Sequence, residues 1–127
     1  MAVKRLPDAE LEIMKIIWHT QGEVASAQIL DALEGKRDWA VTTVLNFLSR
    51  LVERGFLKVR RSGKINMYMP IIDEDTYLEV ESKSFLERLH GNSFKSLVAS
   101  LYGGRGVSKD DLAELKSFID ERAGEGI

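Results

Sequence analysis

The chain has 127 residues, of which 44% are hydrophobic, with no cysteine and a formal net charge of −2. This size and apolar content predict one small folded domain or two very small ones, and the lack of cysteine excludes disulfides and thiolate metal sites. No apolar run approaches the roughly 20 residues of a membrane-spanning helix, and the N-terminus has no signal-peptide apolar region. We therefore expect a soluble, cytoplasmic protein without direct membrane association.

Three helices are predicted before residue 56. Apolar residues at helical spacing indicate a first helix from about Asp8 to His19. Ser26 should cap a shorter second helix that Gly35 closes. The third helix, residues 41–54, should end at Gly55 in the C′ position. Its apolar residues fall in one arc, expected to face the core, and its polar residues fill the other arc; the apolar arc comprises Val41, Val44, Leu45, Phe47, Leu48, Leu51 and Val52.

A β-hairpin and three further helices should follow. Residues 56–61 and 65–70 alternate around the turn residues Ser62 and Gly63, which predicts two paired strands. After Pro70 the pattern predicts a long helix that starts at the acidic residues 73–75 and ends at Gly91-Asn92. A short helix should span Ser93 to Leu101. Ser108 with Asp111 predicts a capping box at the start of the last helix.

This order of elements predicts a mainly α protein with a small β-hairpin wing. We expect a winged helix-turn-helix domain at residues 1–71 and a three-helix dimerisation domain at residues 72–127. The helices after Pro70 amount to about 50 residues, too few to bury their own apolar stripes, so a second copy should cover them. The expected dimerisation residues are Tyr77, Val80, Phe85, Leu86, Leu89, Leu97, Leu101, Leu112, Leu115, Phe118 and Ile119.

The charge is unevenly distributed along the chain. Residues 36–66 carry eight Lys or Arg against two Asp or Glu, whereas residues 1–35 carry three against six and residues 67–127 carry seven against twelve. A basic block in an otherwise acidic chain indicates a surface that binds a polyanion. Because this block covers the third helix and the hairpin, the predicted ligand is double-stranded DNA.

The third helix is the expected recognition helix, because the N-terminal residues of such a helix meet base edges in the major groove. Thr42, Thr43 and Asn46 should read bases, since Thr offers a hydroxyl and a methyl group and Asn can pair with adenine. Arg50 and Arg54, further along, should reach phosphates, and Arg50 could also assist in base reading. On the wing, Arg60, Arg61 and Lys64 should hold the DNA backbone.

Other interpretations of the same residues exist. A polar helix face is often only a solvated surface, and a winged helix can instead serve as a protein-interaction module, which should expose apolar residues on the recognition helix. A regulator that senses a small molecule remains open, although no apolar residue demands a ligand pocket. No catalytic constellation, phosphate-binding loop, metal site or cofactor site is expected: His19 and His90 lie in different predicted domains, and paired carboxylates fall at helix N-termini.

Three segments resemble the penicillinase-repressor (BlaI/MecI/CopY) family of bacterial transcriptional regulators over roughly residues 6–122. They are LPDAELEIMKIIW, VTTVLNFLSRLVERGFL, and INMYMP with the following IDEDTYLEVESKSFLERL. The resemblance implies a homodimeric repressor that binds a near-palindromic operator. It also implies a membrane-bound sensor peptidase as a further partner in the β-lactam branch.

The sequence departs from that family at three places. The family's Asn-Phe cleavage site corresponds here to Ser100-Leu101, so regulatory cleavage there is an expectation that competes with a packing role for Leu101. The cysteine-rich metal site of the copper-responsive branch is absent. Where relatives begin the recognition helix with Ser-Pro, this chain has Ala40-Val41.

Overall fold

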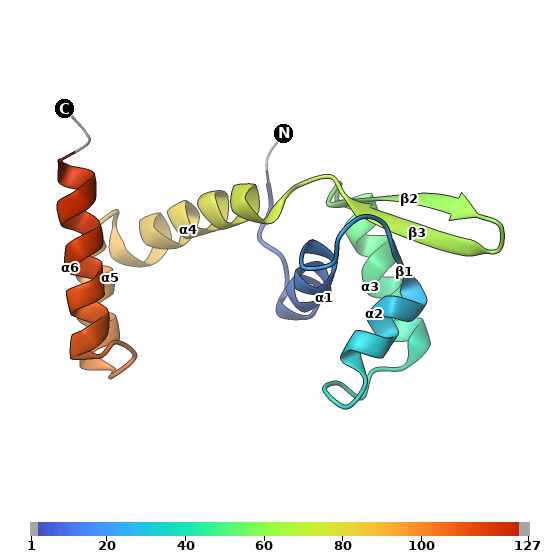
Figure 1. The fold of residues 1–127 in the computed structure, drawn as a ribbon, viewed down its shortest axis with the longest axis horizontal. Coiled ribbons are helices and arrows are strands. Elements are labelled where there is room, and N and C mark those ends of the chain that lie inside the picture. Colours follow the sequence, from blue (N-terminus) through green and yellow to red (C-terminus); the bar gives the residue numbers. More distant parts are fainter. Residues whose placement is uncertain (1–2, 125–127) are drawn as a thin grey trace. The chain divides into compact units, whose positions relative to one another are not determined.

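The computed structural model describes residues 3–124 and divides the chain into two compact units, residues 1–81 and residues 82–127. The elements, labelled in Figure 1, confirm a mainly α fold with a β-hairpin wing. No helix among residues 3–124 is both long enough and apolar enough to cross a membrane. In chain order the elements are α1 (Asp8–Trp18), β1 (Val24–Ala25), α2 (Ser26–Leu33), α3 (Val41–Glu53), β2 (Leu57–Ser62), β3 (Ile65–Pro70), α4 (Glu74–His90), α5 (Phe94–Gly103) and α6 (Lys109–Ala123).

A three-stranded antiparallel sheet with the order β1-β3-β2 completes the first unit. The register joins Leu57 to Pro70 and Ser62 to Ile65, which leaves Gly63 and Lys64 as the hairpin loop. The sequence placed this turn at Ser62-Gly63, one residue too early. Gly63 has a φ of +63°, which glycine adopts readily and which the first position of a tight hairpin loop requires.

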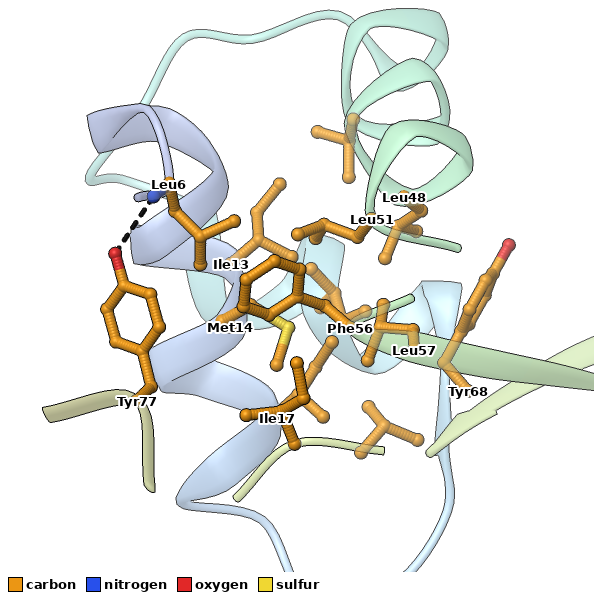
Figure 2. Close-up of a cluster of buried hydrophobic side chains, with 14 of the residues drawn as sticks. Leu6, Ile13, Met14, Ile17, Leu48, Leu51, Phe56, Leu57, Tyr68 and Tyr77 are labelled. Atoms are coloured by element: carbon orange, nitrogen blue, oxygen red, sulfur yellow. Dashed lines mark hydrogen bonds between the residues drawn. The ribbon is translucent and has the colours of Figure 1, made fainter. Parts of the chain in front are cut away.

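One cluster of buried apolar side chains joins the helices of the first unit to its sheet. Figure 2 shows Phe56 and Leu57, at the start of the hairpin, among side chains from α1 and α3. Fully burying such a side chain stabilises a fold by about 1.5–3 kcal/mol. The cluster comprises Leu6, Ile13, Met14, Ile17, Val24, Ile29, Leu33, Val44, Leu48, Leu51, Phe56, Leu57, Tyr68, Ile72 and Tyr77.

The end of α3 determines where the hairpin starts. Gly55 has a φ of +83°, and its N–H donates to the carbonyl of Val52 at 3.1 Å. The next N–H, of Phe56, donates to the carbonyl of Leu51 at 2.9 Å, which completes a Schellman motif. The motif confirms Gly55 as the C′ residue and places Phe56 in the core.

The structure confirms one of the two predicted N-terminal caps. Ser108 Oγ accepts from the N–H of Asp111 at 3.1 Å, and Asp111 Oδ2 accepts from the N–H of Ser108 at 2.9 Å, so the capping box is confirmed. Ser26, by contrast, is the first residue of α2 rather than its cap. There the N–H of Ala25 donates to the side chain of Gln28 at 2.8 Å, which satisfies the backbone without a serine cap.

The first turns of α4 are attached to α1. Tyr77 is only 2% exposed, its hydroxyl accepts from the N–H of Leu6 at 2.9 Å, and its ring lies 5.7 Å from that of Trp18. Glu74 bonds His19 at 3.1 Å and Lys15 at 3.3 Å. Tyr77 therefore belongs to the core of the first unit, which corrects its assignment to the dimer interface. An apolar stripe shows that one face of a helix is buried but not which partner buries it.

The described part of the second unit lacks a buried core. Among residues 82–124 no side chain is buried, and large apolar side chains of all three helices are open to solvent. Helices α5 and α6 lie side by side (Figure 1) and form an open apolar groove of about 440 Å³. The groove is lined by Phe94, Lys95, Val98, Ala99, Tyr102, Leu112, Leu115 and Ile119.

Candidate nucleic-acid interface

Helix α3 presents a polar face from its first turns. It begins at Val41, and the N-cap residue Ala40 supplies no side-chain hydrogen bond. Thr42, Asn46 and Arg50 are exposed, and Thr43 is half-buried at the edge of this face. Within residues 3–124 none of these four side chains takes part in a hydrogen bond or ion pair, so all are free to contact a ligand.

Two apolar residues share that face. Val41 is 55% exposed and Leu45 is 38% exposed, although both were expected to face the core. The core contacts of α3 come instead from Val44, Leu48 and Leu51. The exposure is confined to the first two turns of α3, because Val52, on the same side of the helix near its C-terminus, packs against the core.

Arg54 is exposed like Arg50, but its guanidinium is already paired. Its guanidinium forms an ion pair with Glu10 of α1, whose carboxylate is 1% exposed, so the expectation that Arg54 reaches a phosphate is corrected. A buried carboxylate is strongly destabilising unless it is paired. This pair is not predictable from the sequence, because a single Glu within the apolar pattern of α1 does not identify its partner.

The wing carries four basic residues of the first unit. Lys58, Arg61 and Lys64 are exposed, and Arg61 Nε donates to the carbonyl of Gly63 at 3.2 Å. Arg60 differs, because its guanidinium makes two hydrogen bonds, of 2.9 and 2.8 Å, to the carboxylate of Glu23. The hydrogen bond from Arg60 lowers the pKa of the Glu23 carboxyl below its ordinary value. Arg61 and Lys64 thus offer free charge, whereas Arg60 is already paired.

The turn between α2 and α3 is fixed from two sides. Arg37 makes hydrogen bonds of 2.8 to 3.0 Å to both carboxylate oxygens of Glu12 on α1, and this lowers the pKa of the Glu12 carboxyl. Arg37 also lies over the ring of Trp39 at 5.4 Å, and Trp39 meets Phe47 of α3 edge-on at 5.3 Å. These contacts hold the start of α3 although it lacks a capping side chain.

The other predicted site residues lie on the helices that follow. Val80 on α4 is exposed. In the second unit Phe85, Leu89, Leu101, Phe118 and Ile119 are exposed, and Leu86, Leu97, Leu112 and Leu115 are half-buried. The Ser100-Leu101 bond lies inside α5, where the carbonyl of Ser100 accepts from the N–H of Gly104 at 3.0 Å.

Sequence comparison finds relatives over almost the whole chain. A family model described as penicillinase repressor matches residues 6–121. The penicillinase repressor of Bacillus licheniformis is 31% identical over 119 residues, covering 94% of this chain and 92% of the relative. The methicillin resistance regulatory protein MecI of Mammaliicoccus sciuri is 29% identical over 118 residues, covering 92% and 94%.

Two solved structures resemble the N-terminal part. The solution structure of the DNA-binding domain of the repressor BlaI has a TM-score of 0.53 and 34% identity, covering 61% of this chain and 93% of its own. The Bacillus licheniformis BlaI monomeric form in complex with the blaP half-operator has a TM-score of 0.51 and 32% identity, covering 60% and 92%. The second of these structures includes DNA.

Proposed function

The chain belongs to the penicillinase repressor family, and on this premise we propose that it is a sequence-specific DNA-binding repressor that acts as a homodimer in the cytoplasm without catalysing a reaction. The observation that carries the proposal is the pairing of a free polar face on α3 with a cationic wing in one unit. The relatives named as repressors and the BlaI complex with a half-operator support DNA as the ligand.

In this proposal α3 and the wing have different roles in DNA binding. Thr42, Thr43 and Asn46 read base edges in the major groove, and Arg50 reaches the groove edge or a phosphate. Arg61 and Lys64 hold the DNA backbone, because cations that contact phosphates supply affinity without reading sequence. Arg60 contributes to DNA binding only if its guanidinium leaves Glu23.

The second unit supplies the pairing of two copies. Its exposed apolar stripes and the groove between α5 and α6 would be buried by a second copy of the same unit. The resulting dimer also has the two-fold symmetry that a palindromic operator requires. A sensor peptidase that cuts Ser100-Leu101 would be one means of release. Because proteases act on a locally opened chain, α5 would have to unfold around that bond.

The proposal is tested by fluorescence anisotropy on the duplex upstream of the protein's own gene, with a scrambled duplex as control and several salt concentrations. Asn46→Ala should reduce discrimination between bases by about 1–3 kcal/mol. Arg61→Ala should weaken binding to every duplex alike and lower the salt slope by about one unit.

Two results would contradict the proposal. Equal losses of specific and non-specific binding in both variants would disprove the division of labour. Failure of the wild-type protein to enrich any sequence from a random duplex pool would favour the protein-interaction module instead.

A further inference from the structure

The exposed face of α3 carries an apolar row that the proposed polar contacts do not use. Val41 and Leu45 are 55% and 38% exposed and are spaced i, i+4, so their side chains are neighbours on the helix surface. Thr42 and Asn46 have the same spacing and form the adjacent row. Both rows lie in the first two turns of α3, the part of a recognition helix that meets base edges.

If the first two turns of α3 made only polar contacts with a ligand, two exposed aliphatic side chains would be unexpected there. Isolated exposed apolar residues are ordinary, but these two are contiguous and border free polar side chains. The patch is also too small for a stable protein interface, which needs roughly 800 Å² from each partner. The exposed cations Arg50, Arg61 and Lys64 of the same unit instead favour a polyanion.

Base edges in the major groove offer one apolar group, the C5 methyl of thymine. We propose that Val41 and Leu45 pack against thymine methyl groups next to the base pairs read by Thr42 and Asn46, and thereby make thymine a requirement at defined operator positions. The inference rests on the proposed function and deepens it, because it names the chemical group that the apolar row recognises.

The first test needs no protein variant. The protein selects its preferred sites from a random duplex pool, and each thymine of the selected half-site is then replaced by deoxyuridine, which removes only the methyl group. Burial of one methyl group predicts that affinity falls about fourfold at one or two positions and stays unchanged at the others. Fluorescence anisotropy at fixed salt measures each ratio.

The second test assigns the effect to side chains. Leu45→Ala should abolish the difference between thymine and deoxyuridine at one position, and Val41→Ala should do so at the neighbouring one. Leu78→Ala is the matched control, because Leu78 on α4 is 45% exposed and undergoes the same truncation. Its affinity ratio between the two duplexes should equal that of the wild type.

The possible outcomes separate this inference from the proposed function. Specific binding with no loss on any deoxyuridine duplex, or a selected half-site without thymine, would overturn the inference and leave the repressor intact. A methyl effect that persists in both variants would assign it to other residues and overturn the inference as well. Absence of any sequence preference would overturn both proposals and assign the apolar row to a protein partner.

Discussion

Arg50 and Arg54 lie one turn apart on α3, yet they have different environments. Arg50 is exposed and forms no ion pair within the described part of the chain, whereas Arg54 neutralises a carboxylate that is 1% exposed. The helical pattern of the sequence cannot distinguish the two environments, because both arginines lie on the polar side of the helix. Their difference comes from Glu10, which α1 brings against the end of α3.

Arg54→Ala should lower the free energy of unfolding by about 2–4 kcal/mol, since the Glu10 carboxylate would stay buried without a partner. Arg50→Ala is the matched control and should change stability by no more than about 0.5 kcal/mol. Urea denaturation followed by tryptophan fluorescence measures both values, because Trp18 and Trp39 lie in the first unit.

The double variant Glu10→Met with Arg54→Ala extends this experiment. It should recover most of the lost stability, because an apolar side chain of similar length replaces the buried charge. Equal stability of Arg54→Ala and Arg50→Ala would show that the buried pair contributes nothing.

Glu23→Gln should strengthen binding to all duplexes and leave base preference unchanged. The variant removes a carboxylate beside the wing and frees Arg60 for a phosphate, which should raise the salt slope by up to about one unit. Loss of the exposed ion pair should matter little to the fold, since surface ion pairs contribute little to stability.

Fluorescence anisotropy at several salt concentrations compares the duplex affinity of the wild type with that of Glu23→Gln. The double variant Glu23→Gln with Arg60→Ala is the control and should lose the increase in affinity. Weaker binding by Glu23→Gln would mean that the ion pair positions the wing rather than competing with DNA.

At the scale of elements, the C-terminus of α3 sets the geometry of the site. The Schellman motif at Gly55 ends α3, places Phe56 in the core and directs the chain into β2. Only residues 54–56 join the helix to the wing, and Gly55 among them has a φ of +83°. A change at that residue should affect stability and DNA binding together.

Gly55→Ala should destabilise the first unit by about 1–2 kcal/mol, because a Cβ is unfavourable in the left-handed region. Gly55→Asn should lose less, since Asn tolerates that region better. Thermal or urea unfolding of the two variants gives the comparison. Equal losses would indicate a steric cause at Gly55 instead of a conformational one.

At the scale of the whole molecule, the two units differ in the size of the apolar core that could stabilise each of them alone. The first unit has its own core, whereas no described side chain of the second unit is buried. Small domains without enough core need a partner, and here the exposed groove between α5 and α6 provides the apolar surface for one.

Leu115→Asp should therefore dissociate the homodimer, because it places a charge in the groove between α5 and α6. Ser117→Asp puts the same charge on an exposed position of α6 and should leave the dimer intact. Sedimentation equilibrium at micromolar concentration gives the oligomeric state. Anisotropy should show that Leu115→Asp binds a full operator no better than a half-site. A folded wild-type monomer at that concentration would refute the dimer.

The sequence alone determined the order of the six helices and the hairpin and most of the helix boundaries, but not the short strand β1. Gly55 and the Ser108-Asp111 capping box were predictable because their signals are local: a conformation or a hydrogen bond within a few residues. The basic block at residues 36–66 was equally visible, since charge adds along the chain without reference to the fold.

Only the tertiary structure decided which residues meet. The burial of Tyr77 beside α1, the pairing of Arg54 with Glu10 and of Arg60 with Glu23, and the exposure of Leu45 all depend on segments distant in sequence. Periodicity reports that a helix has two faces, but the neighbour that covers each face is set by long-range packing. The proposed thymine contact depends on this packing. Because no element of the first unit covers Leu45, its side chain is available to DNA.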